Sequence, residues 1–302
     1  MRSGFVCIVG RPNVGKSTLT NALVGQKVAI TSSRPQTTRH VIRGIVHKDN
    51  GQLVLIDTPG IHRPRTLLGE RLNALVAETY ADVDVIVMCF PADEAIGPGD
   101  RFIAQEVAAV PKAKKVAVVT KTDAATRNQV GNQLLAVAQL GAELGISWSE
   151  IVPVSAVAND QVGLLADLLI EQLPEGPALY PESDVTDEPE DIMIAELIRE
   201  AALEGVRDEL PHSIAVVLDE MGLRPDRPED RPLMDIFAVV YVERESQKHI
   251  VIGKGGSRLK EVGMEARAAI SELLGVPVHL DLRVKIAKDW QRDPKQLDRL
   301  GF

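Results

Sequence analysis

The feature that most constrains the fold is an eight-residue segment that fits the pattern G-x-x-x-x-G-K-[ST]. Its members are Gly10, Arg11, Pro12, Asn13, Val14, Gly15, Lys16 and Ser17. An apolar run at 5–9 precedes it and a stretch with helical spacing follows at 18–24, so the chain should pass from strand through turn to helix. In such a unit, backbone N–H groups at the helix N-terminus surround phosphate oxygens. We therefore predict a nucleotide phosphate site, with Lys16 on the β- and γ-phosphates, Ser17 on Mg²⁺, and Thr18 next to them.

The pattern around this segment predicts an α/β domain. Apolar runs bounded by turn residues recur at 5–9, 41–46, 53–56, 83–90, 116–120 and 151–154, and helical spacing occurs at 67–80, 102–110, 130–144 and 162–173. Near-continuous apolar strands that alternate with helices indicate a mostly parallel sheet covered on both faces. The runs 41–46 and 53–56 are an exception, because the Asn50-Gly51 turn between them favours an antiparallel hairpin.

Three further motifs come directly after predicted strands. They are Asp57, Thr58, Pro59 and Gly60; Thr120, Lys121 and Asp123; and Ser155 and Ala156. Asp57 could hold a Mg²⁺-bound water and Gly60 could let the backbone approach a γ-phosphate. The carboxylate of Asp123 could accept from guanine N1–H and its exocyclic amine, and the Ser155-Ala156 backbone could donate to guanine O6. Each motif alone is more often a plain loop, but parallel sheets bind ligands where all of them fall.

Together these motifs resemble a translation-factor-class GTPase domain over the first 175 residues. The stretch 30–40 is similar to the first switch of the Era GTPase family, and the seam from Leu173 to Pro181 also looks Era-like. The resemblance implies GTP or GDP with Mg²⁺ as ligands, slow intrinsic hydrolysis, and a second Mg²⁺ hydroxyl from Thr38, with Thr37 as the alternative. It makes Lys16, Thr38, Asp57 and Gly60 the expected catalytic residues. A P-loop kinase or ATPase remains the competing class, against which Lys121 and Asp123 argue.

Two positions depart from common GTPase patterns. Thr120 stands where the base-recognition motif usually has Asn, which braces the phosphate loop and touches guanine N7. We expect a single hydroxyl to brace less well. Ile61 stands where Ras-like enzymes place the glutamine that orients water, and it cannot do that work. One hypothesis is that Asn13 seats a cation such as K⁺ near the phosphates; the alternative is that it only shapes the loop.

A second unit follows with its own glycine motif. The pattern predicts a helix at 192–210, strands at 213–218 and 236–242, an apolar turn at 250–252, a helix ending at 274, and a strand at 278–286. This order resembles a smaller α+β type II KH domain, whose G-x-x-G loop clamps about four unpaired nucleotides. We expect RNA contacts from Ile252, Gly253, Lys254, Gly255, Gly256, Arg258 and Lys260.

Ile250 and Val251 could line the groove or pack in the core. Lys248 and Arg267 add local charge, and Lys285, Lys288, Trp290 and Arg292 could extend the contact or form a solvated tail.

Charge and composition complete the expected organisation. The net charge of −9 is concentrated in 176–235, with 17 acidic against 5 basic residues, whereas 236–302 carries 12 basic against 9 acidic. We expect a GTPase domain at 1–175, an acidic, proline-rich linker at 176–190, and a KH domain with a tail at 191–302. Cys7 and Cys89 lie in apolar, strand-like runs, which is typical of buried thiols in a reducing compartment. No apolar run approaches the length of a membrane span, so we expect a cytoplasmic protein. We also expect a monomer. The resemblance implies 16S-type ribosomal RNA and the small ribosomal subunit as partners, and it leaves contact with the inner membrane face open.

Overall fold

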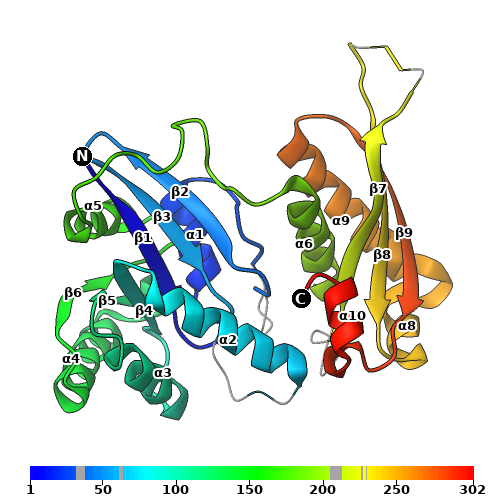
Figure 1. Ribbon diagram of the computed structural model, residues 1–302. Helices are drawn as coiled ribbons and strands as arrows, with labels where there is room; N and C mark the ends of the chain where they lie inside the picture. The colour runs from blue at the N-terminus through cyan, green and yellow to red at the C-terminus, as the bar shows by residue number, and fades with distance from the viewer. Residues whose placement is uncertain (32–37, 61–63, 65, 205–212, 226, 229) are drawn as a thin grey trace. The chain divides into compact units, whose positions relative to one another are not determined.

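The computed structural model describes residues 1–31, 38–60, 64, 66–204, 213–225, 227–228 and 230–302. It divides into two compact units, one formed by Met1–Arg65 with Gly69–Asp187 and the other by Thr66–Leu68 with Glu188–Phe302 (Figure 1). No helix in these described ranges is long and apolar enough to cross a bilayer.

The first unit is an α/β domain. Its sheet strands are β1 (Arg2–Val9), β2 (Ile42–Lys48), β3 (Gly51–Asp57), β4 (Val85–Pro91), β5 (Lys114–Thr120) and β6 (Trp148–Pro153). Its helices are α1 (Lys16–Val24), α2 (Leu67–Ala81), α3 (Pro98–Ala108), α4 (Arg127–Leu144) and α5 (Val162–Gln172), with a 3₁₀ turn at Thr122–Ala124. The sheet order is β2-β3-β1-β4-β5-β6, and β2 runs antiparallel to β3, which confirms the predicted mostly parallel sheet and its hairpin.

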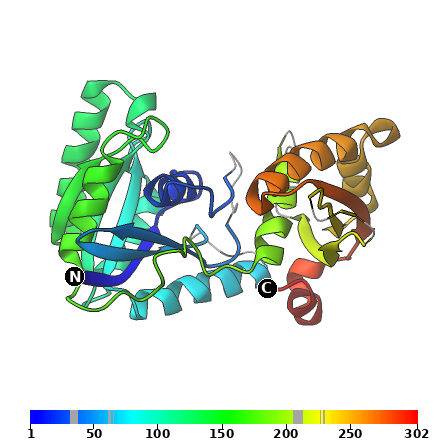
Figure 2. The same ribbon diagram turned by 90° about the horizontal axis from the view of Figure 1, so that it is seen from above.

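Helices cover both faces of the sheet (Figure 2), and an apolar core lies on each side of it. Along β1, Val6 and Ile8 belong to the core shared with α1 and α5, whereas Cys7 and Val9 belong to the core shared with α2, α3 and α4. This division follows from the two-residue period of a strand, which sends successive side chains to opposite faces. Both faces are therefore buried, and the carboxyl ends of the parallel strands are left to present polar groups.

Residues beyond Leu173 do not leave this sheet at once. The Ile45 N–H donates to Val185 O at 2.8 Å, and the Thr186 hydroxyl donates to Arg43 O at 2.7 Å, so this segment lies along β2. Gln52 of β3 is fully buried, and its side chain bonds the segment at Leu179 N (2.7 Å) and at Tyr180 O (2.8 Å). Much of the acidic stretch expected to be a linker is thus attached to the edge of the first sheet.

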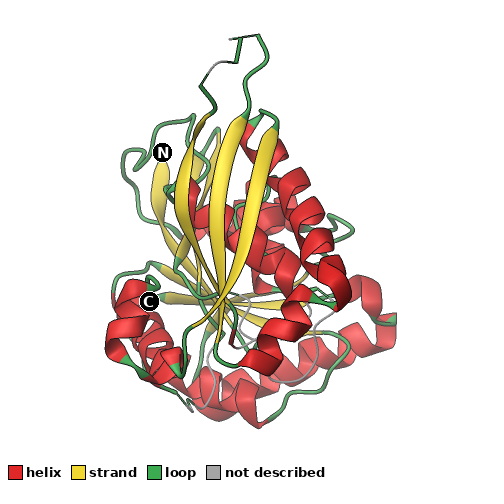
Figure 3. Cartoon of the chain, turned by 90° about the vertical axis from the view of Figure 1, so that its right-hand side faces the viewer, coloured by secondary structure: helices red, strands yellow, loops and turns green. Residues whose placement is uncertain are grey.

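The second unit is α+β. Its elements are α6 (Glu190–Leu203), β7 (Ala215–Leu223), β8 (Met234–Val242), α8 (Glu245–Ile252), the 3₁₀ turn Lys254–Gly256, α9 (Ser257–Leu274), β9 (Val278–Ile286), the 3₁₀ turn Trp290–Arg292 and α10 (Pro294–Arg299). The three strands form one sheet in the order β7-β8-β9, with β7 antiparallel and β9 parallel to β8 (Figure 3).

Three predictions for this unit were wrong in detail. Residues 250–252 close the helix α8 instead of forming an apolar turn. The helix expected at 192–210 ends at Leu203, and 205–210 lie outside the described residues. Lys285 lies inside β9, within the strand predicted at 278–286, and its side chain is exposed. Trp290 is fully buried, donates its indole N–H to Ser213 O at 3.0 Å, and stacks on Phe302 at 5.4 Å between ring centroids. It therefore packs in the core and is not placed to contact RNA.

The burial of Trp290 leads to a stability prediction. We expect Trp290→Ala to lower the free energy of unfolding of the second unit by about 3–5 kcal/mol, because it leaves a cavity and removes the hydrogen bond from the indole to Ser213 O. Urea unfolding followed by circular dichroism would measure this loss, and GDP would identify the transition of the first unit, which it should shift. The control Trp290→Phe keeps most of the buried ring and should lose less. A loss below about 1 kcal/mol for Trp290→Ala would contradict this account.

Candidate nucleotide and RNA sites

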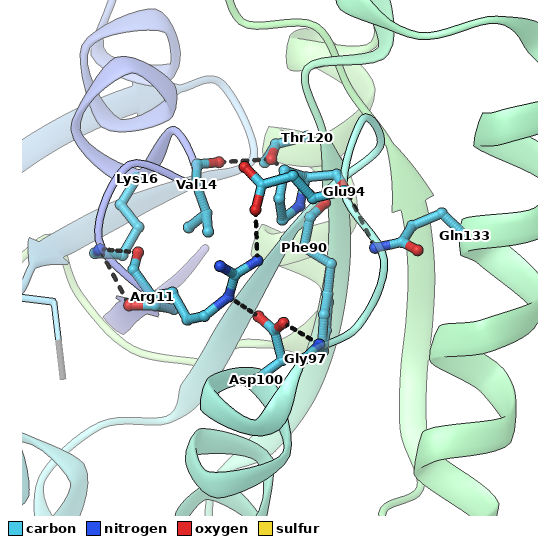
Figure 4. Close-up of polar contacts among 11 residues, drawn as sticks. Arg11, Val14, Lys16, Phe90, Glu94, Gly97, Asp100, Thr120 and Gln133 are labelled. Carbon is cyan, nitrogen blue, oxygen red and sulfur yellow. Dashed lines mark hydrogen bonds and ion pairs between the residues drawn. The ribbon is translucent and has the colours of Figure 1, made fainter. Parts of the chain in front are cut away.

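The phosphate loop between β1 and α1 has the backbone of an anion cradle. Gly10, Asn13 and Gly15 have positive φ values of 151°, 63° and 96°, and Gly15 lies directly before the first turn of α1. Lys16 is buried, and its ammonium group donates to Gly10 O at 3.1 Å and Arg11 O at 2.9 Å (Figure 4). Burial lowers the pKa of Lys16, while the nearby Asp57 carboxylate opposes that shift. A bound phosphate would offer this lysine stronger, charged acceptors than the two carbonyls.

Three oxygen-bearing side chains meet beside this loop. The Ser17 hydroxyl donates to Asp57 Oδ2 at 2.6 Å and lies 2.9 Å from the Thr38 hydroxyl, which itself donates to the same carboxylate oxygen at 3.2 Å. Asp57 is fully buried, and its Oδ1 has no hydrogen-bond partner in the described part of the protein. Burial raises the pKa of Asp57, against the opposing effects of Ser17, Lys16 and Thr38.

This cluster fits Mg²⁺. The ion prefers oxygen ligands and is usually held by one or two protein groups together with phosphate oxygens. The unpartnered Oδ1 of Asp57 is a buried acceptor that a Mg²⁺-bound water would satisfy. The structure thus brings together Ser17, Thr38 and Asp57, which the sequence separated by up to 40 positions. The alternative Thr37 and the position of Ile61 lie outside the described residues.

The segment after Asp57 is also fixed against the phosphate loop. The Thr58 hydroxyl donates to Ile8 O at 2.9 Å. A methyl group added at Gly60 would lie 3.0 Å from the backbone nitrogen of Pro12, closer than side chains normally approach. Glycine is therefore required for the close approach of these two loops.

A cavity of about 230 Å³ lies between the loops that follow β5 and β6. Gly15, Thr120, Lys121, Asp123 and Ala156 line it, together with Thr18, Leu19, Ala124, Val154 and Val157. The Ser155 hydroxyl donates to Asp123 Oδ1 at 2.6 Å and accepts from Ala158 N at 3.0 Å, so it orients that carboxylate. The Ser–Asp contact was not predicted from the sequence, although both residues were. The arrangement suits a planar base with hydrogen-bond donors facing Asp123.

Thr120 does brace the phosphate loop. It is buried at the end of β5, and its hydroxyl donates to Val14 O at 2.6 Å (Figure 4). We expected threonine to brace less well than asparagine; the structure gives it a short bond to the loop.

Arg11 of the phosphate loop pairs with two acidic residues, Asp100 and Glu94, that belong to none of the predicted motifs. Its Nε donates to Asp100 Oδ1 at 2.7 Å and a terminal nitrogen donates to Glu94 Oε2 at 3.0 Å (Figure 4). Asp100 is buried and also accepts from Gly97 N at 2.8 Å, so it caps α3 while it holds the loop arginine. Asp100 is one acidic residue among many in the sequence, and only the fold reveals this pairing.

The glycine motif of the second unit lies between α8 and α9. Gly253, Gly255 and Gly256 all have positive φ, and the exposed Lys254 is carried by the turn they form. Val251 is buried and packs in the core, whereas Ile250 is exposed and Ile252 is partly exposed. Of the two alternatives, core packing therefore applies to Val251, and a place along the groove stays open to Ile250 and Ile252. Lys260 is exposed.

Arg258 is engaged within the protein. Its guanidinium donates to the carbonyl oxygens of Ala201 and Glu204 at the end of α6 and lies 3.2 Å from Glu261. It therefore joins the start of α9 to α6. Lys248 is partly exposed, and Arg267, Lys288 and Arg292 are exposed.

Comparison with known proteins places these sites in context. A family model described as a 50S ribosome-binding GTPase matches residues 5–122, and a KH domain model matches 209–291. The chain is 70% identical over 301 residues to the GTPase Era of Streptomyces coelicolor, covering 100% of this chain and 95% of that protein. It is 65% identical over 302 residues to the GTPase Era of Mycolicibacterium smegmatis, covering 100% and 99%.

Two solved structures resemble the whole chain. One is Era in complex with MgGDPNP and nucleotides 1506–1542 of 16S ribosomal RNA, with a TM-score of 0.93 at 36% identity over 100% of this chain and 99% of that one. The other is a variant of Aquifex aeolicus Era bound to GDP·AlF₄⁻, with a TM-score of 0.92, 36% identity and the same coverage.

Proposed function

The chain belongs to the Era family of GTPases, and from that premise we propose that its nucleotide state controls binding of the 3′ end of 16S-type ribosomal RNA during assembly of the small ribosomal subunit. It is a two-domain GTPase with a KH domain that binds RNA. A solved relative holds a GTP analogue, Mg²⁺ and a 16S RNA segment together, which supports one cycle that couples both sites.

The observation that carries this proposal is the contact of Thr38 with Ser17 and Asp57. Thr38 precedes β2, so the first switch meets the phosphate loop through a residue that would join it in holding Mg²⁺. Bound Mg²⁺ would neutralise charge on the phosphates. Around it, Lys16 would turn from the loop carbonyls to the β- and γ-phosphates, and Gly60 would let the backbone N–H groups approach the γ-phosphate. Hydrolysis and release of phosphate would remove the γ-phosphate oxygens from this site, and with them part of the arrangement that orders Thr38.

The test is RNA affinity in the two nucleotide states. We expect the full chain to bind a 3′-terminal 16S fragment more tightly with Mg²⁺ and a non-hydrolysable GTP analogue than with Mg²⁺ and GDP. A scrambled RNA of equal length is the control. Equal affinity in the two states would favour the second candidate, an RNA-binding module whose GTPase domain does not switch. Equal binding of the scrambled RNA would remove the ribosomal target.

A monovalent cation is a further part of the proposed cycle. Asn13 lies in the middle of the phosphate loop with φ of 63°, a conformation that asparagine adopts more readily than most residues. Its side-chain amide oxygen could serve as a ligand to a cation beside the phosphates. The apolar Ile61 cannot orient the attacking water, so hydrolysis would depend more on stabilisation of the transition-state charge, and K⁺ near Asn13 could supply positive charge in place of an arginine finger. We expect GTP turnover at least tenfold faster in KCl than in NaCl, and Asn13→Ala should lose that difference. Equal turnover in both salts, or K⁺ stimulation retained by Asn13→Ala, would refute the cation.

The proposal extends to the cellular setting. We propose that the protein works in the cytoplasm as a monomer, with peripheral contact to the inner face of the membrane as a separate possibility. Sedimentation of the purified chain, alone and with anionic vesicles, tests both statements.

A further inference from the structure

The hydroxyl of Thr120 has one proton, and the structure gives that proton to the phosphate loop. Val14 O lies 2.6 Å from Oγ1, and Phe90 O lies 3.4 Å from the same atom. Both atoms are carbonyl oxygens, which only accept hydrogen bonds. The shorter contact takes the proton, so toward its other neighbours Thr120 presents only lone pairs.

Thr120 is also part of the wall of the base cavity. It lines that cavity together with Lys121 and Asp123, and a Cβ built on Gly15 would lie 3.8 Å from its own Cβ. The side chain is thus fixed between the phosphate loop and the base, and its burial leaves little freedom to rotate. A change of rotamer toward the base would break the bond to Val14.

Guanine presents only acceptors, N7 and O6, on its major-groove edge. An acceptor facing the Thr120 lone pairs gains nothing, because neither partner carries a proton. An asparagine amide has two N–H donors, so one could bond the loop and the other could reach N7. Threonine can meet only the first of these requirements.

We propose that Thr120 removes N7 from base recognition in this protein, so that guanine is selected by Asp123, as oriented by Ser155, without a hydrogen bond to the imidazole edge. This inference rests on the guanine-nucleotide function proposed above. It states which edge of guanine the site recognises through hydrogen bonds. It makes position 120 a specificity-determining residue of the nucleotide site.

The probe is 7-deaza-GDP, in which a C–H replaces N7 and the edge that faces Asp123 is unchanged. We expect the full chain to bind GDP and 7-deaza-GDP within about twofold of each other. Thr120→Asn should bind GDP about five- to tenfold more tightly than the deaza analogue, the effect of one neutral hydrogen bond. Calorimetric titration would give each ratio.

Thr120→Val is the matched variant, because it keeps the branched shape and removes the hydroxyl. It should weaken both nucleotides together through loss of the Val14 brace and leave their ratio near one. A tenfold preference of the unmodified protein for GDP, or a ratio that changes in Thr120→Val, would show that the hydroxyl reads N7 and would overturn the proposal. Equal binding of both nucleotides by Thr120→Asn would also overturn it. A protein that binds ADP as well as GDP would instead refute the underlying guanine-nucleotide function.

Discussion

Replacing Asp123 with asparagine should lower the affinity for GDP by about a hundred- to a thousandfold and raise the affinity for xanthosine diphosphate. The carboxylate can accept from two guanine donors, and hydrogen bonds to a charged group contribute about 1.5–3 kcal/mol each. Asparagine keeps one acceptor and turns a donor toward the exocyclic amine, which is itself a donor. Xanthine has a carbonyl at that position, so the mismatch becomes a bond. Ser155 can still donate to the amide oxygen, so the side chain stays oriented.

Competition between labelled GDP and unlabelled xanthosine, adenosine and guanosine diphosphates would measure this change. Asp160→Asn is the matched control, because Asp160 is an exposed carboxylate in the loop after β6 and has no predicted contact with the base. It should leave all three affinities unchanged. An Asp123→Asn protein that keeps its GDP affinity would mean that another group selects the base.

The second large effect concerns the glycine motif of the KH domain. The double substitution Lys254→Asp with Gly255→Asp should reduce affinity for single-stranded RNA at least a hundredfold. It replaces a cation with two carboxylates at the loop where the phosphates are expected, and charge is the largest contribution to nucleic-acid affinity. The fold should survive, because Gly255 has a φ of 61°, which aspartate tolerates better than most residues, and its added Cβ would meet no atom of the described residues within 4 Å.

Fluorescence anisotropy with a labelled 3′-terminal 16S fragment would report the loss, and an unchanged urea unfolding transition of the second unit would show that the KH domain is intact. Lys295→Asp, which reverses an exposed charge in α10, is the control and should bind RNA nearly as well as the unmodified chain. Similar losses from the two proteins would indicate that overall charge, and not this loop, determines RNA binding.

The sequence predicted the parts of the nucleotide site that are local in the chain. The phosphate loop follows a continuous apolar strand, and the other motifs also end strands, so their meeting at one edge of the sheet follows from the parallel order. The side-chain contacts made between different loops could not be predicted from these local patterns. The bond from Ser155 to Asp123 and the pairing of Arg11 with Asp100 depend on loop conformations that no local pattern encodes.

The errors in the second unit have similar causes. Only the last residues of α8 are apolar, so its polar first half hid the helical period. Trp290 is flanked by charged residues, which suggested a solvated tail, but its indole ring packs in the core through contacts with Ser213 and Phe302. Burial of this kind is set by tertiary packing and not by sequence neighbours.

The segment attached along β2 has a consequence for how the protein behaves at high concentration. β2 is the outermost strand at its side of the sheet, and an outermost strand with open N–H and C=O groups can recruit a strand from another molecule. Val185 and Thr186 already occupy part of that rim, and the buried amide of Gln52 fixes the same segment at Leu179 and Tyr180. The chain thereby shields its own sheet from intermolecular β-pairing, and the acidic side chains of this segment add charge repulsion between copies.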